Sequence, residues 1–251
     1  MSSKSRYHLL DSLRGFSLVN MILYHIIWDI VYIFGCNLSW FGGRLTYIWQ
    51  QAICFSFILI SGFCFAFSKK KLLNGVRVLA CSFFISLVTI FIMPDNTILF
   101  GVLSLIGSSM IIMIPLEKIL KKLNPYIGMT VFVLLFILTK NIATGYIGIL
   151  DIKLLELPEF LYKNLFTAYL GFPSKEFISY DYFPIIPWLF LYISGYFIYL
   201  ISKRRGYLKF LYKPRIKVLE CLGKHSLLVY MLHQPAIYIL LYVIFNRVIK
   251  I

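Results

Sequence analysis

Seven apolar segments, each long enough to cross a lipid bilayer as a helix, follow one another along this chain of 251 residues. A membrane-spanning helix needs about 20 apolar residues, because in lipid each backbone N–H and C=O must find its partner within the segment. The segments are rich in Leu, Ile, Phe, Val and Tyr without strict alternation, which favours helices over a β-barrel. The predicted spans are 10–34, 46–68, 74–93, 98–116, 125–140, 183–202 and 224–246.

The composition supports the same fold class. Charged residues make up only 14% of the chain, too few to give a soluble domain of this size a polar surface. The sequence therefore predicts an all-α protein, a polytopic transmembrane helical bundle of about seven spans. We expect residues 1–251 to form a single transmembrane domain. The first span carries charges and ends without a small-residue cleavage site, so we expect it to be retained as a span.

The longest connection between the predicted spans covers residues 141–182. It is polar in places but contains the apolar stretch "FLYKNLFTAYLGF". Connections of this length usually have a function or lack order. We expect either an interfacial helix or a re-entrant segment that caps a cavity.

The formal net charge of +15 has two explanations. Nucleic-acid binding is one, but the sequence contains no recognisable nucleic-acid-binding module. The other is the positive-inside rule, by which Lys and Arg gather in the loops that stay in the cytoplasm. Basic residues do gather on one side of the predicted spans, before the first span and at 69–77, 118–122 and 203–224. We therefore expect an integral protein of the inner or plasma membrane, with a cytoplasmic N-terminus and an external C-terminus.

The first span contains four titratable side chains, which are Asp11, Arg14, His25 and Asp29. An α-helix advances about 100° per residue, so the four fall within an arc of about 60°. Along the axis, Arg14 and His25 are separated by about 16 Å. Ionisable residues inside a span are costly, and a stripe of them must face protein or water rather than lipid. The stripe therefore predicts a functional site, with Arg14 toward the cytoplasm and His25 in the outer half.

Each of these residues also has a simpler explanation. Arg14 can extend its guanidinium to the headgroups, His25 can bond to a backbone carbonyl in the core, and Asp29 can be a solvated residue at the helix end. Their shared face favours a functional role. Asp29, one turn after His25, can accept a hydrogen bond from one imidazole nitrogen and leave the other nitrogen as a base.

Two further polar residues are candidates. His233 precedes Gln234 and Pro235 in the last span, where the proline frees a backbone carbonyl. His233 can line a cavity or make a hydrogen bond between helices. Asp181 lies where the long connection meets the sixth span, and it can orient an acceptor group or be solvated.

Several motifs resemble those of known membrane enzymes. "LDSLRGFSLVNMILYH" resembles the opening helix of integral membrane acyltransferases, in which an arginine is followed by ten residues and then a histidine. The other motifs are "FILISGF" (57–63), "FGVLSLIGSS" (100–109), "DYFPIIPW" (181–188) and "SLLVYMLHQP" (226–235). In this order and spacing they resemble the small bacterial members of the heparan-alpha-glucosaminide N-acetyltransferase-like family.

The resemblance implies an enzyme that moves an acyl group, expected to be acetyl, from acyl-CoA to a carbohydrate-type acceptor. We predict His25 and Asp29 as catalytic residues and Arg14 as the residue that binds the donor. We assign Asp11, Asp181 and His233 to the substrate. The sequence departs from the family in two ways. No histidine occurs between Cys36 and Thr46, and Cys81 stands four residues after Arg77, where related O-acetylases have a second arginine.

No metal is predicted, because the histidines at 8, 25, 225 and 233 form no ligand pair at helical spacing. The expected partners are membrane lipid, acetyl-CoA and a sugar or glycan, and a homo-oligomer is compatible with the sequence. The rival interpretation is a proton-coupled transporter in which the Asp–Arg–His–Asp stripe is a proton relay. A structural membrane subunit is a third class, which the charges inside a span disfavour.

The charge bias predicts the topology. Cysteines introduced at 141–182 should react with a membrane-impermeant reagent added to intact cells, whereas cysteines at 203–217 should not. Permeabilised cells provide the control, because both segments should then react. Labelling of 203–217 in intact cells would reverse the orientation.

Overall fold

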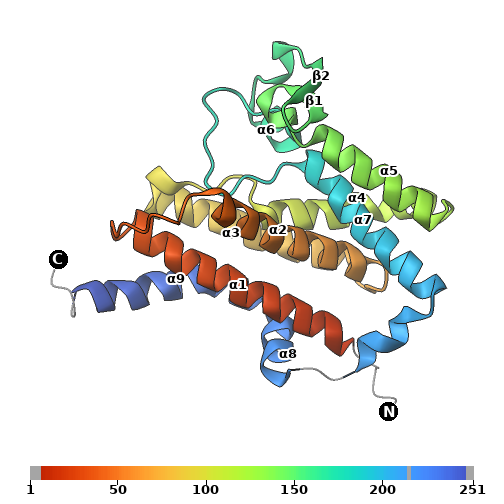
Figure 1. Cartoon of the computed structure of the whole chain (residues 1–251), viewed down its shortest axis with the longest axis horizontal. Helices are drawn as coiled ribbons and strands as arrows, with labels where there is room; N and C mark the ends of the chain where they lie inside the picture. The colour runs from red at the N-terminus through yellow and green to blue at the C-terminus, as the bar shows by residue number, and fades with distance from the viewer. Residues whose placement is uncertain (1–6, 214–215, 247–251) are drawn as a thin grey trace. The chain divides into compact units, whose positions relative to one another are not determined.

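The computed structural model describes residues 7–213 and 216–246 (Figure 1). The helices are α1 (His8–Tyr32), α2 (Arg44–Phe65), α3 (Lys71–Ile92), α4 (Val102–Leu120), α5 (Pro125–Thr139), α6 (Leu165–Leu170), α7 (Ile185–Arg204), α8 (Lys217–Lys224) and α9 (Ser226–Ile244). Two short strands, β1 (Tyr146–Ile149) and β2 (Ile152–Glu156), form an antiparallel hairpin.

Seven helices in the described part of the chain are long and apolar enough to cross a membrane. They are α1 to α5, α7 and α9, with the span at α5 continuing to Thr144. The predicted helical bundle of about seven spans is therefore confirmed. The predicted boundaries agree with the helices to within a few residues.

The contacts of the chain divide it into two compact units. The first unit combines Met1–Phe57 with Gly206–Ile251, and the second is Ile58–Arg205. Helix α2 belongs to both, because the division falls between Phe57 and Ile58. The first and last membrane spans therefore belong to the same unit.

Two glycines allow α8 to cross α1 at very short range within the first unit. A Cβ atom at Gly15 would lie 2.0 Å from the Leu219 carbonyl oxygen, and one at Gly223 would lie 1.8 Å from the Asp11 carbonyl oxygen. Only glycine permits backbones to approach so closely. The same unit contains a core of Leu18, Met21 and Ile53.

The second unit contains the α3–α4 and α5–α7 pairs, and its helices also meet at glycines. A Cβ atom at Gly62 would lie 2.0 Å from the Tyr192 carbonyl oxygen, and one at Gly195 would lie 2.3 Å from the Leu59 carbonyl oxygen. The last part of α2 therefore packs directly on α7. Tyr192 is fully buried at this contact.

The 141–182 connection differs from the expectation in its secondary structure. It contains the β1–β2 hairpin and the six-residue helix α6, as Figure 1 shows beside the end of α5. Ile149 pairs with Ile152, and the register shifts between Ile147 and Gly148. The strands were missed because each has only four or five residues and neither alternates between buried and exposed positions.

Gly223→Ala should destabilise the protein. Alanine normally favours a helix over glycine by about 1 kcal/mol, but here its Cβ would clash with the α1 backbone, and overpacking costs about 1–3 kcal/mol. Thermal unfolding in detergent should therefore show a lower midpoint for the variant. The control is Gly43→Ala, because a Cβ there would lie 3.6 Å from its nearest neighbour, the Trp40 carbonyl oxygen. Equal midpoints for the two variants would argue against the close α1–α8 crossing.

Candidate functional site

Four polar side chains from the first and last spans meet inside the first unit, and we call them the α1–α9 cluster. Helix α1 contributes His25 and Asp29, and α9 contributes His233 and Gln234. The two imidazole rings contact edge to face, with centroids 4.8 Å apart. The Gln234 amide nitrogen donates a hydrogen bond of 2.7 Å to Asp29 Oδ1.

Local helix geometry explains how the cluster forms. His25 and Asp29 are one turn apart and so share a face of α1, which packs against α9. Next to these residues, Ile237 and Leu241 of α9 pack against Ile26 of α1 and hold the two helices in contact. The cluster is thus supported by an apolar contact along the same pair of helices.

The hydrogen bonds of the two histidines define their tautomers. Nδ1 of His25 lies 2.8 Å from the Met21 carbonyl oxygen, and Nδ1 of His233 lies 2.6 Å from the Tyr230 carbonyl oxygen. A carbonyl oxygen only accepts, so each Nδ1 carries the proton and donates it. In the neutral rings each Nε2 is then a hydrogen-bond acceptor and a potential base.

Three buried polar atoms of the cluster make no hydrogen bond within the described residues. They are Asp29 Oδ2, Gln234 Oε1 and His233 Nε2. Asp29 is completely buried, so its second oxygen has no contact with solvent. An unsatisfied buried polar atom typically costs about 1–3 kcal/mol, and functional sites are where such costs are retained. Each of the three atoms can accept a hydrogen bond from an N–H or O–H donor.

The structure gives Asp29 a different partner from the one we expected. Asp29 bonds to Gln234, and His25 is oriented by the Met21 carbonyl rather than by a carboxylate. Sequence reasoning missed Gln234 as a site residue. Its position next to His233 and before Pro235 was the available signal, but a single sequence does not reveal which residue of α1 it meets.

Arg14 and Asp11 lie at the other end of α1, where α8 crosses. Arg14 Nη1 is 3.2 Å from Asp11 Oδ1, and the Arg14 side chain remains 27% exposed. Asp11 is buried, and its carboxylate holds the guanidinium in place. A second pair joins α1 to α8, because His8 Nδ1 lies 2.9 Å from Glu220 Oε2 of α8. This end of the unit therefore presents a partly exposed cation held by a buried carboxylate.

Asp181 belongs to the second unit, where it bonds to the start of α4. Its Oδ2 accepts a hydrogen bond of 3.1 Å from the Val102 backbone N–H, and a Cβ atom at Gly101 would lie only 2.6 Å from the same oxygen. A carboxylate at a helix N-terminus is favoured by the helix dipole. Burial outweighs this effect and raises the pKa of Asp181 to about 6. The carboxyl therefore has an intramolecular contact that stabilises the start of α4.

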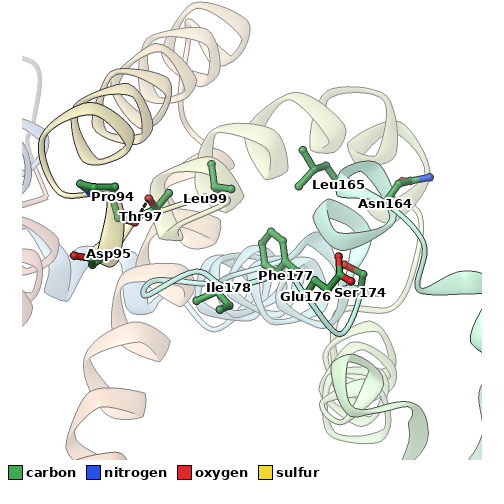
Figure 2. A pocket seen from close by; sticks show the side chains of 10 residues that line it. All are labelled: Pro94, Asp95, Thr97, Leu99, Asn164, Leu165, Ser174, Glu176, Phe177 and Ile178. Atoms are coloured by element: carbon green, nitrogen blue, oxygen red, sulfur yellow. Dashed lines mark hydrogen bonds between the residues drawn. The ribbon is translucent and has the colours of Figure 1, made fainter.

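A pocket of about 650 Å³ lies elsewhere in the second unit. Figure 2 shows the Phe177 ring between the 94–99 segment and Leu165. The lining of the pocket also includes the carboxylates of Asp95 and Glu176. None of the residues predicted from the sequence lines this pocket.

No metal-binding group of three or more His, Cys, Asp or Glu side chains occurs among residues 7–213 and 216–246. The potential ligands of the α1–α9 cluster are two imidazoles and one carboxylate, and the carboxylate already bonds to an amide. The cluster is therefore a set of hydrogen-bond acceptors and bases, suited to binding donor groups and to accepting a proton.

Comparison with protein families identifies the family of the chain. The family model described as "Heparan-alpha-glucosaminide N-acetyltransferase, catalytic" matches residues 6–235. The chain therefore belongs to the heparan-alpha-glucosaminide N-acetyltransferase-like family, as its motifs indicated, and is a membrane acetyltransferase in general type. No curated protein and no solved structure gives a significant match.

Asp181 makes stability depend on pH. Because its folded pKa of about 6 lies above the ordinary 3.8, its contribution is fully present below about pH 4 and is lost as the pH rises through 6. The loss is on the order of 2–3 kcal/mol. Asp181→Asn keeps an oxygen for Val102 but does not titrate, so its thermal midpoint should fall less than that of the wild type between pH 4 and 7. Asp95→Asn, at an exposed carboxyl, should behave like the wild type. Identical pH profiles for all three proteins would contradict this account.

Proposed function

We propose that the protein transfers an acetyl group from acetyl-CoA to a carbohydrate-type acceptor, and that the α1–α9 cluster is its active site. The observation that carries the proposal is the set of three buried, unpaired acceptor atoms, on Asp29, Gln234 and His233, next to the His25 ring of the Arg-x10-His motif. Membership of an N-acetyltransferase family supports the reaction type.

His25 is the proposed general base. Its Nε2 removes the proton from the acceptor hydroxyl or amine while that group attacks the thioester carbonyl. A C–O or C–N bond forms, the C–S bond breaks, and the imidazolium returns the proton to the departing CoA thiolate. Transfer through an acylated histidine is the alternative route.

The three unpaired acceptors are the proposed acceptor-binding atoms. A sugar presents several O–H or N–H donors on one rigid ring, which matches Asp29 Oδ2, Gln234 Oε1 and His233 Nε2. In this arrangement Asp29 favours the imidazolium through its charge rather than by a direct hydrogen bond. Gln234 positions Asp29 by holding its other oxygen.

Arg14 is the proposed donor contact. Its guanidinium has the fork geometry that binds a phosphate or a carbonyl, and Asp11 orients it. The distance of about 16 Å along α1 separates this cation from His25, so an extended donor can reach from one to the other. Asp181, the other predicted substrate residue, contributes by ordering the start of α4.

The proposal treats residues 1–251 as one acyltransferase domain, because the family match extends across both units. The charge bias supports a cytoplasmic N-terminus and an external C-terminus in the inner or plasma membrane. Lys4, Arg6 and Arg215, which contribute to that bias, lie outside the described residues.

Incubation of the purified protein with acetyl-CoA alone tests the reaction class. Slow release of CoA, or an increase in intact mass by one acetyl group, supports an acetyltransferase. A proton-coupled transporter would release no CoA and would instead show proton-dependent uptake in vesicles. Its proton relay would be the titratable stripe of α1.

His25→Ala should lower acetyl transfer by about 10²–10⁴-fold, the usual contribution of a general base. Asp29→Asn should lose less, and His233→Ala less still. Gln234→Ala should also reduce the rate. Asn20→Ala should not, although Asn20 also takes part in an interhelical hydrogen bond, which it accepts from Trp49. Initial rates of CoA release with glucosamine or hydroxyl-only sugars measure these effects, with unfolding midpoints as the fold control. Normal activity of His25→Ala would exclude His25 as the base.

Arg14→Lys should weaken donor binding. Lysine keeps the charge but not the fork, and a lost hydrogen bond to a charged group costs about 1.5–3 kcal/mol, or roughly 10–100-fold in affinity. The KM for acetyl-CoA should rise while kcat at saturating donor changes little. Arg44→Lys, at an exposed arginine of the same unit, serves as the control. An unchanged KM in Arg14→Lys would reject the donor role.

A further inference from the structure

The β1–β2 hairpin exposes an unusually apolar surface, which we call the hairpin face. It consists of Ile149, Leu150, Ile152, Leu154 and Leu155, all of them exposed. Leu150 at the turn is 81% exposed and Ile152 is 68% exposed. Several large aliphatic side chains exposed on so short a segment are unfavourable in water and mark a contact with another apolar phase.

The one basic side chain of the hairpin, Lys153, is paired within it. Lys153 Nζ lies 3.1 Å from Glu156 Oε1 and 5.6 Å from the centre of the Tyr146 ring. Both contacts hold the ammonium group close to the strands. Asp151, the remaining charge, sits in the turn itself, where it can reach polar headgroups.

The turn is also adapted to a poorly hydrated environment. The Leu150 carbonyl oxygen accepts two hydrogen bonds, each of 2.8 Å, from the Asn141 side-chain amide and from the Tyr146 hydroxyl. Both lone pairs of this carbonyl are thus satisfied by the protein. A backbone group with its hydrogen bonds made can leave water at little cost, whereas an unpaired one cannot.

The hydrogen bond from Asn141 to the Leu150 carbonyl also fixes the position of the turn relative to the membrane. Asn141 comes two residues after the end of α5 and lies within the candidate span Pro125–Thr144. Strand β1 packs against α5, and Figure 1 shows the hairpin beside the end of that helix. The turn is therefore held at the level where a membrane-spanning helix leaves the lipid.

The hairpin face continues a surface that already faces lipid. Helix α5 exposes Val131, Leu134 and Ile137 along its length. In a membrane-spanning helix such exposed aliphatic residues contact acyl chains. Helix α5 and the hairpin that packs against its end therefore both expose apolar side chains.

We propose that the hairpin face inserts into the membrane interface at the end of α5, with its aliphatic side chains at the boundary between headgroups and acyl chains. This goes beyond the acetyl-transfer proposal, because it assigns a lipid-binding role to the 141–182 connection whatever reaction the protein catalyses. Lipid is the favoured occupant, since the turn is tied to a membrane span and its carbonyl is already satisfied. A second copy of the chain is the competing occupant.

Depth-dependent fluorescence in lipid nanodiscs tests the proposal. In the full chain with its native cysteines replaced by serine, Leu150→Cys and, separately, Leu154→Cys are labelled with an environment-sensitive fluorophore. The control is Lys175→Cys, from the same connection, because the Lys175 side chain is 93% exposed and polar. Nanodiscs are suitable because both faces are accessible, so the result does not depend on orientation.

The hairpin labels should emit at shorter wavelength than the Lys175 label, be quenched by nitroxide-bearing lipids, and be protected from aqueous iodide. Agreement between positions 150 and 154 guards against a local effect of one substitution. Labels at both positions that resemble the Lys175 control would overturn the proposal. Labels shielded from iodide and from nitroxide lipids, with energy transfer between chains in discs holding two copies, would assign the face to a second copy instead.

Discussion

In a bilayer each polar group must find its partner inside the protein, and this constraint shapes every part of the molecule. It restricts the backbone to helices across the membrane, because only they satisfy their own N–H and C=O groups. It also places the titratable stripe of α1 against α8 and α9 rather than lipid. Glycines at the crossing of α1 and α8 bring these two helices into close contact, and His8 of α1 bonds to Glu220 of α8 there.

The polar groups of α1 obey this constraint unequally. At one end, Asp11 pairs with Arg14 and His8 pairs with Glu220, so the buried carboxylates are compensated. In the α1–α9 cluster, by contrast, the hydrogen bonds orient each group and leave one acceptor atom on Asp29, Gln234 and His233 unpaired. Such partial satisfaction is costly for stability, and in the proposed function these acceptor atoms bind a ligand with several donors.

The second unit uses its polar groups for order. Asp181 bonds to the start of α4, and Ser179 accepts from the Leu99 N–H and donates to the Leu99 carbonyl. These contacts tie the end of the 141–182 connection to α4. The connection thereby keeps a defined path while its hairpin exposes apolar side chains.

The sequence by itself determined the class of fold, because the lengths and composition of the apolar segments leave helices as the solution for lipid. It also identified the stripe on α1, since helical periodicity alone places Arg14, His25 and Asp29 on one face, and the order of the motifs indicated the family.

The sequence did not identify the partners across helices. That Gln234 rather than His25 bonds to Asp29, and that Asp181 meets Val102, depends on helix rotation and on loop paths. The short strands also escaped prediction, because each has only four or five residues and neither alternates between buried and exposed positions. The partners of Asp29 and Asp181, in contrast, arise only from contacts between residues distant in the chain, which the tertiary structure decides.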